Sequence, residues 1–576
     1  MRGESSRGGP VDNQQVIDAL LALADGLEIL DDNPFKVRAY RRAAQSIESL
    51  DMPVSQIVEQ GEISRIDGVG KAIADKIEAW VIRGDFSALE EVRSRIPHGI
   101  DELLKVPGLG VKRVRLLHEQ LGVNTLEDLL DACRQGRLEG VKGFPRKRVH
   151  ELEAAVETVM GYRGKYLLDT SLDYADEVLG RLHQARLHAE LSGECRRTME
   201  VISAIDILVE KTSEARGLIR ECLADVSVND KGSVLHIPSE RKRPPVHLHL
   251  VEKGEFPLAM FFTTGSKEHV ERMRDRAREM VYELNDTGMF SGEKRIEVRD
   301  EEDIYRELSL PYIPPEIREE TVATFYEQDY TIPRLLEGHQ IKGTVHNHTT
   351  FSDGRTPLKE LVQRAREMGY AWIGISDHSK SAYYAGGMSI DDIQRQHREI
   401  EALERDIDGI TILKGIESDI LPDGSLDYPE DVLDSFDFVI ASIHSHMDMD
   451  RDRMTDRIVQ ALRNPFTSIF AHPTGRLLLA REPYRVNLDV VLTEALKNHV
   501  AIELNANPMR LDLDWRRIPG FIRAGGKIAI GPDAHVAQGL LDMRYGVMMA
   551  RKGLLTPDAC LNTYDVTKIR RTFART

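Results

Sequence analysis

The chain has 576 residues, enough for about four domains of ordinary size. Hydrophobic residues make up 41% and charged residues 30%, which excludes a chain that is disordered throughout. With 77 Lys and Arg against 95 Asp and Glu, the net charge of −18 argues against a protein that coats nucleic acid through bulk electrostatics.

Cysteine content and hydropathy indicate the cellular compartment. The four cysteines are too few and too scattered for a disulfide framework or a CxxC metal site, which fits a reducing environment. The first ten residues are polar and lack the apolar stretch of a secretory signal. No apolar run approaches the roughly 18 residues that a membrane span needs. We therefore expect a soluble, cytoplasmic protein with no membrane association.

The N-terminal part contains a repeated motif. Residues 1–11 are expected to be a disordered tail, and residues 12–90 and 91–160 to form two groups of amphipathic helices. Each group holds an apolar-x-Gly-x-Gly turn that ends in a lysine and opens a helix, where backbone N–H groups can approach a phosphate. A single copy would favour a plain helical connection with Gly as a cap, but two copies favour helix-hairpin-helix elements that bind the DNA backbone. The residues concerned are Gly68, Gly70, Lys71, Gly108, Gly110 and Lys112.

The middle of the chain changes to an α+β pattern. Strand-like segments at 201–210 and 244–252 alternate with helical segments through residues 161–252, and further helices follow in 253–320. A Pro- and Glu-rich stretch at 310–320 then introduces a linker, which we place at 321–340.

The C-terminal region, residues 341–576, has a regular alternation of strands and helices. Short apolar strands are predicted at 371–376, 411–416, 437–443, 468–471, 500–504 and 527–531, with amphipathic helices between them. Seven or so strand–helix units indicate parallel strands in a closed or nearly closed β/α barrel.

Histidines and carboxylates follow most of these strands. The carboxyl ends of parallel barrel strands converge on one rim, so these side chains are expected to meet, and two histidines spaced as His-x-His on a strand share one face. Imidazoles and carboxylates without thiolates suit Zn²⁺, Mn²⁺ or Fe²⁺. Nine such residues are too many for one ion and suit two or three, with Glu417 as a bridge. They are His346, His348, Asp353, His378, Glu417, His444, His472, Asp533 and His535.

Clustered divalent ions favour phosphoester hydrolysis, because they activate water and stabilise the attacking and leaving oxygens. Three basic residues near the same rim, Lys380, Arg476 and Arg510, are candidates for holding phosphate oxygens, although each could equally form a surface ion pair. We assign Glu417, Asp533, His378 and Arg476 to catalysis.

The motifs of this region resemble a known domain. VHNHTTFSDG, GISDHSKS, GIESDILPDGSLDYP, ASIHSH, AHPTGRLL, ELNANPMRLDL and GPDAH resemble the PHP (polymerase and histidinol phosphatase) domain, in the version fused to bacterial family X DNA polymerases. Upstream, TTGSKEHVERMRDRA, ELNDTGMFSGEKRI and LPYIPPEIREE resemble the polymerase thumb, and NPFKVRAYRRAA with the two hairpins resembles that family's DNA-binding domain and fingers. The resemblance covers nearly the whole chain from residue 12.

This resemblance implies a multidomain fold: an α-helical helix-hairpin-helix domain (12–90), fingers with a second hairpin (91–160), a nucleotidyltransferase palm (161–252), a thumb (253–320) and a distorted (β/α)7 PHP barrel (341–576). It also implies a Mn²⁺- or Zn²⁺-dependent 3′→5′ exonuclease, with 3′-end phosphatase or abasic-site cleavage as related activities. One metal would be bound by His346, His348, Glu417 and Asp533, a second by Glu417, His444 and His472, and a third by Asp353, His378 and His535. His446 falls outside these sets.

The palm departs from the family pattern. Family members carry Asp-x-Asp on one strand and a third Asp on the next, and the matching positions here are Ala204, Asp206 and His247. One carboxylate cannot hold two Mg²⁺ ions, and imidazole is a poor Mg²⁺ ligand. The nucleotide-binding turn is altered as well, because Glu194 introduces a negative charge and Thr198 replaces a glycine. We therefore predict a degenerate palm whose polymerase activity is absent or very weak.

These patterns together predict a monomeric DNA-repair nuclease that acts on DNA ends, gaps or abasic sites. Lys76 aligns with the lyase nucleophile of the vertebrate beta polymerases, but a DNA-phosphate contact is the preferred interpretation. Three alternatives remain: an active gap-filling polymerase with an associated exonuclease, a DNA-binding scaffold with structural metals, and a small-molecule phosphatase of the histidinol-phosphate type.

Overall fold

The computed structural model describes residues 13–48, 50, 52–83, 86–239, 243–325 and 331–574. The expected tail at 1–11 lies outside these residues, as does part of the expected linker at 321–340. The chain divides into two compact units, Met1–Arg163 and Gly164–Thr576. Within the described residues, no helix is long and apolar enough to cross a membrane.

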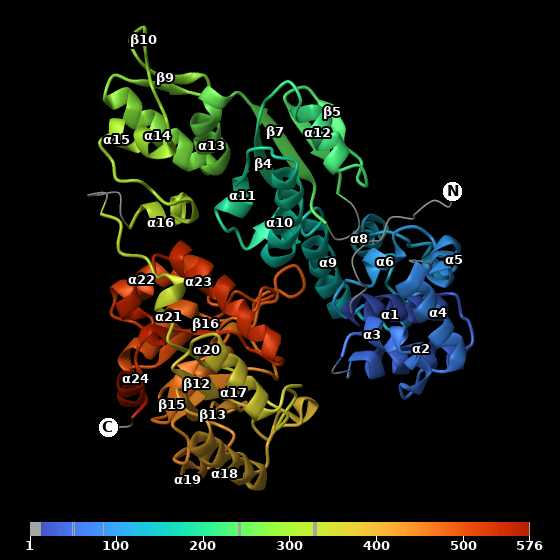
Figure 1. Cartoon of the computed structure of the whole chain (residues 1–576). Coiled ribbons are helices and arrows are strands. Elements are labelled where there is room, and N and C mark those ends of the chain that lie inside the picture. Colours follow the sequence, from blue (N-terminus) through green and yellow to red (C-terminus); the bar gives the residue numbers. More distant parts are fainter. Residues whose placement is uncertain are drawn as a thin grey trace. The chain divides into compact units, whose positions relative to one another are not determined.

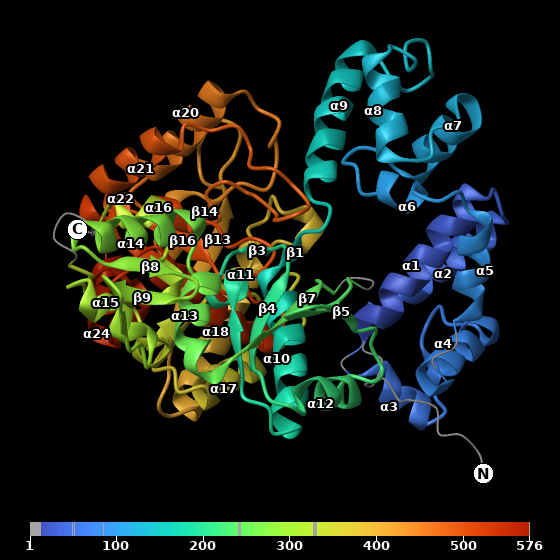
Figure 2. The same ribbon diagram turned by 90° about the horizontal axis from the view of Figure 1, so that it is seen from above.

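The first unit is helical, as the sequence predicts. Its helices are drawn in shades of blue and teal in Figure 2. Two hydrophobic clusters organise it, one formed mainly by α1–α5 and the other mainly by α6–α9. Its elements are α1 (Asn13–Ile29), α2 (Pro34–Glu48), α3 (Val54–Glu59), η1 (Ile63–Arg65), α4 (Lys71–Arg83), α5 (Ser87–Arg95), α6 (Ile100–Leu103), α7 (Val111–Leu121), α8 (Leu126–Arg134) and α9 (Arg146–Gly161).

The second unit begins with residues 164–252, the region that the family resemblance identifies as the palm and that is called the palm below. Its five-stranded mixed sheet has the order β2-β4-β7-β6-β5, and β4 and β7 are parallel neighbours. The elements are β1 (Tyr166–Leu167), α10 (Leu168–Gln184), β2 (Ala189–Ser192), α11 (Gly193–Arg196), β3 (Val201–Ile202), β4 (Ile205–Glu210), α12 (Ala215–Cys222), β5 (Asn229–Lys231), β6 (Val234–Ile237) and β7 (Val246–Val251).

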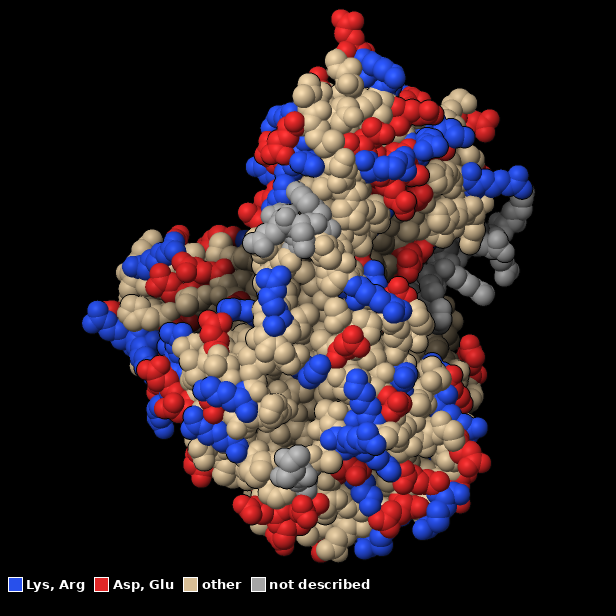
Figure 3. Space-filling view, turned by 90° about the vertical axis from the view of Figure 1, so that its left-hand side faces the viewer, with Lys and Arg blue, Asp and Glu red and all other residues tan. Residues whose placement is uncertain are grey.

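The thumb follows the palm and combines helices with a small antiparallel sheet of order β10-β9-β8. Its elements are η2 (Lys253–Glu255), α13 (Phe256–Thr264), α14 (Lys267–Glu279), β8 (Glu283–Asn285), β9 (Gly288–Ser291), β10 (Lys294–Ile296), α15 (Glu301–Glu307), η3 (Pro315–Ile317) and α16 (Glu320–Ala323). On the face drawn in Figure 3, basic and acidic side chains are interspersed over the thumb and the barrel.

The C-terminal region is the predicted barrel. Seven parallel strands follow one another in chain order, and a bridge between Asn347 and Ala534 brings the two ends of the sheet together. The strands are β11 (Gly343–Thr344), β12 (Trp372–Ile375), β13 (Thr411–Asp419), β14 (Phe438–Ser442), β15 (Thr467–Phe470), β16 (Ala501–Asn505) and β17 (Ile528–Gly531).

Helices surround these strands (Figure 1) because each crossover between parallel neighbours runs along the outside of the sheet. They are α17 (Leu358–Glu367), α18 (Ile390–Asp406), α19 (Glu430–Leu433), α20 (Arg451–Leu462), α21 (Leu488–Lys497), α22 (Ile518–Arg523), α23 (Met543–Lys552) and α24 (Val566–Phe573), with η4 (Gly338–Gln340), η5 (Tyr383–Ala385), η6 (Trp515–Arg517), η7 (Ala537–Asp542), η8 (Pro557–Ala559) and η9 (Leu561–Thr563).

A buried lysine joins the barrel to the palm and thumb. Lys552 is fully buried, and its Nζ donates to the Arg197 carbonyl at 2.9 Å, the Glu316 carbonyl at 3.2 Å and a Glu319 carboxylate oxygen at 3.0 Å. Nearby, the indole N–H of Trp515 donates to Glu200 at 2.9 Å. These contacts compensate the buried charge. The largest hydrophobic cluster of the second unit includes residues of the palm, the thumb and the barrel, and two smaller clusters lie beside it.

Candidate metal centre and DNA-binding elements

The predicted ligands lie where the barrel strands end, but the backbone there is not regular strand. The sequence interpretation placed His346 and His348 within a strand, where alternate residues share a face. In the structure β11 ends at Thr344, so both histidines follow the strand. Their rings still lie 5.2 Å apart between centroids. His346 (φ 59), His472 (φ 28) and Asp533 (φ 54) adopt the left-handed region. Non-glycine residues seldom adopt this conformation, and such strain is concentrated at functional sites.

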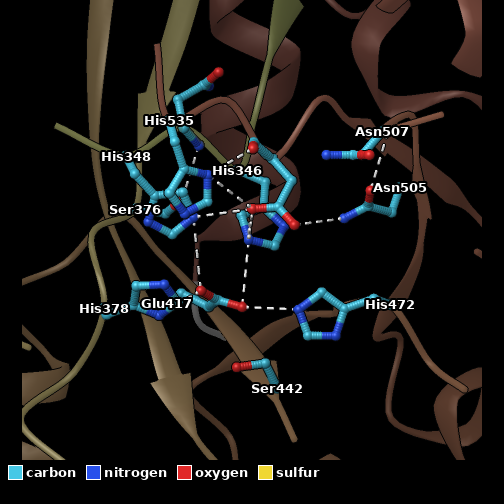
Figure 4. A network of polar contacts seen from close by, with 12 residues as sticks. His346, His348, Ser376, His378, Glu417, Ser442, His472, Asn505, Asn507 and His535 are labelled. Atoms are coloured by element: carbon cyan, nitrogen blue, oxygen red, sulfur yellow. Dashed lines mark hydrogen bonds and ion pairs between the residues drawn. The ribbon is translucent and has the colours of Figure 1, made fainter. Parts of the chain in front are cut away.

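Glu417, on β13, is the centre of the cluster (Figure 4). Its Oε1 lies 3.3 Å from His346 Nε2, 3.0 Å from His472 Nε2 and 3.2 Å from His444 Nε2. Its Oε2 lies 2.8 Å from His378 Nδ1. One carboxylate therefore faces imidazoles on both sides, so each of its oxygens could help to hold a metal ion.

Asp353 and Asp533 supply the remaining carboxylates. Asp353 Oδ1 is 3.5 Å from His378 Nε2 and 3.3 Å from His535 Nε2. Asp533 Oδ1 lies 3.2 Å from His348 Nε2 and 3.5 Å from His346 Nε2.

All nine predicted side chains thus meet in one cluster, but their grouping differs in part from the one that the family resemblance implies. His348 joins the Asp353 group, His444 pairs with His378, and His472 pairs with His346. The groups are His348, Asp353, His378 and His535; His346, Glu417 and His472; His346, His348 and Asp533; and His378, Glu417 and His444. His446, which the resemblance leaves out, is exposed.

The unpaired atoms of the cluster fit divalent ions. Among the described residues, six buried donor or acceptor atoms here have no hydrogen-bond partner: His346 Nε2, both ring nitrogens of His348, Asp353 Oδ1, His378 Nδ1 and Glu417 Oε2. Buried polar atoms without partners are costly unless they bind something. Nitrogen and carboxylate oxygen donors of this kind suit Zn²⁺, Mn²⁺ or Fe²⁺.

Electrostatics divide the imidazoles of the cluster into two kinds. Although burial favours the neutral ring, the neighbouring carboxylates raise the pKa of His378 to about 10 and that of His444 to about 9, so these rings would release a proton when a cation binds. Burial favours the neutral form of Glu417, but His444, His378 and His346 hold the pKa of its carboxyl well below its usual range. Burial and His378 lower the pKa of His348 to about 3, and burial and Arg510 lower that of His472 to about 4. Both imidazoles are therefore neutral at pH 7, the form that donates a lone pair to a metal.

Two buried carboxylates that the sequence interpretation missed support the ligands. Glu503, on β16, contacts His346 Nδ1 and accepts from the His472 backbone N–H at 2.7 Å. Asp419 Oδ1 lies 2.6 Å from His444 Nδ1. Such carboxylates orient metal-binding imidazoles and set their tautomer. The sequence could have indicated Asp419, because it follows Glu417 by two residues on the same strand and alternate residues of a strand share a face.

Of the three candidate phosphate-binding residues, Arg510 alone lies against the cluster, with its Nε 3.4 Å from Asp533 Oδ2. Arg476, which the sequence interpretation assigned to catalysis, has its donor groups engaged outside the cluster. Its side chain is almost fully buried and donates to the carbonyls of Arg510 and Leu511 and to Asp514 at 2.9 Å, so it braces that loop. The Lys380 ammonium lies over the ring of Tyr428, 5.6 Å from its centroid.

The two hairpins of the first unit share one geometry. Gly68 (φ 73) and Gly108 (φ 77) turn the chain in the left-handed region that favours glycine. Two residues later, the carbonyls of Gly70 and Gly110 accept the first hydrogen bonds of α4 and α7. The N-terminal amides of both helices therefore follow exposed glycines, as an anion-binding turn requires. Lys76 donates to the Ala72 carbonyl of its own helix at 3.0 Å.

The palm presents a different polar cluster. Ala204 precedes β4, and Asp206 is paired in register with His247 on β7. Asp206 Oδ1 lies 3.2 Å from His247 Nδ1 and 2.9 Å from His249 Nε2, a residue that the sequence interpretation missed. Burial disfavours the Asp206 carboxylate, but the two histidines lower its pKa to about 2.

The nucleotide-binding turn of the palm is occupied by contacts within the chain. Arg196 donates to Thr264 Oγ1 at 2.8 Å and Glu301 at 2.5 Å, and Arg197 donates to Glu319 at 2.9 Å. Glu194 accepts from the Ser203 backbone N–H at 2.6 Å. Thr198 has φ 52, so it stands in a conformation that a glycine adopts more readily.

Family models match four regions of the chain. They describe a helix-hairpin-helix domain at residues 11–86, a SAM-like helix-hairpin-helix tandem at 100–154, a DNA polymerase beta thumb at 259–319 and a PHP domain at 344–507. These matches agree with the expected order of hairpins, thumb and barrel.

Whole-chain comparison finds similar proteins. The chain is 34% identical over 560 residues to a Bacillus subtilis (strain 168) protein named "DNA polymerase/3′-5′ exonuclease PolX", covering 95% of this chain and 97% of that protein. The barrel region is 29% identical over 242 residues to a "Probable phosphatase" of Thermoanaerobacter sp. (strain X514), covering 39% of this chain and 91% of that protein. It is also 25% identical over 227 residues to a "Probable phosphatase" of Shewanella sediminis (strain HAW-EB3), covering 38% of this chain and 87% of that protein.

Proposed function

The chain belongs to the bacterial PolX family, and from this membership and the geometry of the barrel we propose that it is a DNA-repair enzyme whose PHP domain is a metal-dependent 3′→5′ exonuclease. In this proposal the family X core serves mainly to bind DNA. The observation that carries it is the Glu417 carboxylate, which is buried among four inward-facing imidazoles with unpaired donor atoms around it.

Two or three divalent ions, Mn²⁺, Zn²⁺ or Fe²⁺, would be held by the nine clustered side chains. When bound, they supply activation of water and neutralisation of the charge that develops on the phosphate. Glu417 keeps both of its oxygens directed into the cluster, and Asp533 is held there by Arg510. The Arg510 side chain is about one-fifth exposed, so its guanidinium is also available to a phosphate oxygen at the rim.

Two exposed tyrosines at the same rim are suited to hold the end of a strand. Tyr383 and Tyr384 are 87% and 71% exposed, although aromatic side chains of this size are usually buried. The Tyr384 ring lies 6.2 Å from the rings of both His378 and His444. Aromatic rings beside a nuclease centre stack on bases of single-stranded DNA without sequence preference. We assign Tyr384 to the terminal nucleobase.

The DNA backbone would bind at the two hairpins. Backbone amides at the starts of α4 and α7, with Lys71 and Lys112 beside them, offer contacts to phosphates that need little net positive charge. This reconciles DNA binding with a chain of net charge −18. Lys76 contributes a further phosphate contact.

We assign no nucleotidyl transfer to the palm. The two-metal mechanism needs several carboxylates, whereas the described palm offers Asp206 beside two histidines. The arginines of the turn are also engaged with the thumb. The alternative function is an active gap-filling polymerase. The observation in its favour is the whole-chain similarity to a protein named as both polymerase and exonuclease.

Single-turnover digestion of 3′-labelled DNA with added Mn²⁺ tests the exonuclease. Stepwise shortening from the 3′ end is expected, and His378→Ala should abolish it. His339→Ala is the matched control, because His339 is an exposed histidine at the opposite end of the barrel strands, before β11. No cleavage, or cleavage unaffected by His378→Ala, would instead favour a DNA-binding scaffold with structural metals.

Primer extension on gapped DNA with Mg²⁺ or Mn²⁺ tests the palm. The expected result is no templated synthesis above a protein-free control. Robust synthesis that disappears in Asp206→Asn would overturn the assignment and favour the gap-filling polymerase.

A further inference from the structure

The palm carries a cluster of potential metal ligands that is separate from the barrel. Asp206 lies on β4, and His247 and His249 lie on the parallel neighbour β7. Alternate residues of a strand share a face, so the two histidines project to the same side of the sheet. The register sets Asp206 beside His247, which brings one carboxylate and two imidazoles together.

The distances suit a small transition-metal ion. The Asp206 carboxylate is 3.2 Å from His247 Nδ1 and 2.9 Å from His249 Nε2, and ligand atoms of all three residues lie within 4.8 Å of one another. In a tetrahedral zinc site with bonds of about 2.0–2.2 Å, donor atoms stand roughly 3.3–3.6 Å apart. Small rotations of the side chains are enough to reach this spacing.

The surroundings form a cradle with an open side. A Cβ on Gly193 would lie 2.5 Å from Asp206 Oδ2, so this glycine lets the backbone approach the carboxylate. His236 stacks on His247 with ring centroids 5.3 Å apart, and its buried Nδ1 has no hydrogen-bond partner among the described residues. The three ligand side chains are each about one-quarter to one-third exposed, which leaves a coordination position open to solvent.

We propose that Asp206, His247 and His249 bind one Zn²⁺ ion, with the open position available to water or a phosphate oxygen. Two imidazoles and one carboxylate select zinc over magnesium, because Mg²⁺ prefers oxygen ligands in octahedral geometry. The site does not depend on the exonuclease assigned to the barrel, since it shares no residue with that cluster.

Histidine modification read by mass spectrometry tests this site on the full chain. Metal-free protein is treated with diethylpyrocarbonate with and without Zn²⁺, and fragment spectra resolve modification at His247 and His249. Residue-level detection separates the palm from the barrel. His188 is the internal control, because it belongs to the same domain and lies 3.2 Å from Glu190 and 3.4 Å from Glu210 without forming such a cluster.

Zn²⁺ should protect His247 and His249 but not His188, and Mg²⁺ should protect none of the three. Asp206→Asn should raise the Zn²⁺ concentration needed for half-protection at least about tenfold. Glu190→Gln, a matched loss of a carboxylate beside a histidine, should leave protection unchanged. Circular dichroism and the reactivity of His188 verify folding.

If Asp206→Asn does not fold, His249→Gln replaces it, and protection of His247 should then be lost. The proposal is overturned if Zn²⁺ leaves His247 and His249 as reactive as in the metal-free chain. Protection that survives unchanged in Asp206→Asn or His249→Gln overturns it as well.

Discussion

Replacing Glu503 with Gln tests how the barrel prepares its ligands. The Glu503 carboxylate contacts His346 Nδ1 and accepts from the His472 backbone N–H at 2.7 Å, and it is fully buried. A carboxylate only accepts hydrogen bonds, so it keeps the hydrogen of the His346 ring on Nδ1. The lone pair of Nε2 is then directed at Glu417 and Asp533, where a metal would bind.

Glutamine has nearly the same shape but one acceptor oxygen. If that oxygen faces His346, the amide N–H₂ opposes the His472 N–H, and a buried unsatisfied donor costs about 1–3 kcal/mol. If the side chain is reversed, the amide donates to His346 Nδ1, and the ring hydrogen moves to the ligand nitrogen. Loss of such a supporting carboxylate typically costs 10–100-fold in metal affinity, or about 1.4–2.7 kcal/mol, the same range.

Equilibrium dialysis of metal-free protein against Mn²⁺, followed by metal analysis, measures this effect. We expect half-saturation of one ion per chain at roughly 10–100-fold higher Mn²⁺ in Glu503→Gln, with the exonuclease rate recovering at excess Mn²⁺. Glu401→Gln is the matched control, because Glu401 pairs with Lys414 at 2.6 Å on the outside of the barrel. A Glu503→Gln chain that binds Mn²⁺ as tightly as the wild type would refute the reasoning.

Three further predictions concern DNA binding and stability. Tyr384→Ala should weaken binding of a 3′ single strand by about 1–3 kcal/mol in steady-state kinetics, mainly through KM, whereas Tyr384→Phe should not, because stacking needs only the ring. Lys71→Ala and Lys112→Ala should each reduce the slope of log DNA affinity against log salt concentration by about one unit. Lys147 is exposed, and Lys147→Ala should change this slope less. Burial lowers the pKa of Lys552 to about 8 from its ordinary 10.5, so between these values the unfolded chain binds more protons. The free energy of unfolding should therefore rise with pH across this window by about 3 kcal/mol more in the wild type than in Lys552→Met, measured by denaturant titration. An equal rise in both proteins would contradict the Lys552 assignment.

The candidate site illustrates how far sequence reasoning extends. The nine barrel side chains were predictable because ligand-type residues follow successive parallel strands, and the ends of such strands converge on one rim. Arg476 appeared equally suitable from its position in the motif HPTGR. Its burial against the loop at 510–514 was not predictable, since it depends on how two loops pack.

The polar contacts between distant strands required the structure. Glu503 supports His346 across 157 residues of sequence, and no local pattern marks that pair. In the palm, the sequence indicates that carboxylates are missing from the family pattern. It does not indicate that His249 lies beside Asp206, because that contact depends on the register of β4 with β7.

The sequence by itself thus determined the order of hairpins, polymerase-like core and barrel, because hydrophobic periodicity and short motifs are local properties of the chain. Tertiary structure decided which polar side chains lie in one cluster, which Lys and Arg side chains form ion pairs with neighbouring carboxylates, and which donor atoms remain without a hydrogen-bond partner. These properties depend on distances between residues far apart in the chain, and such distances exist only once the core has packed.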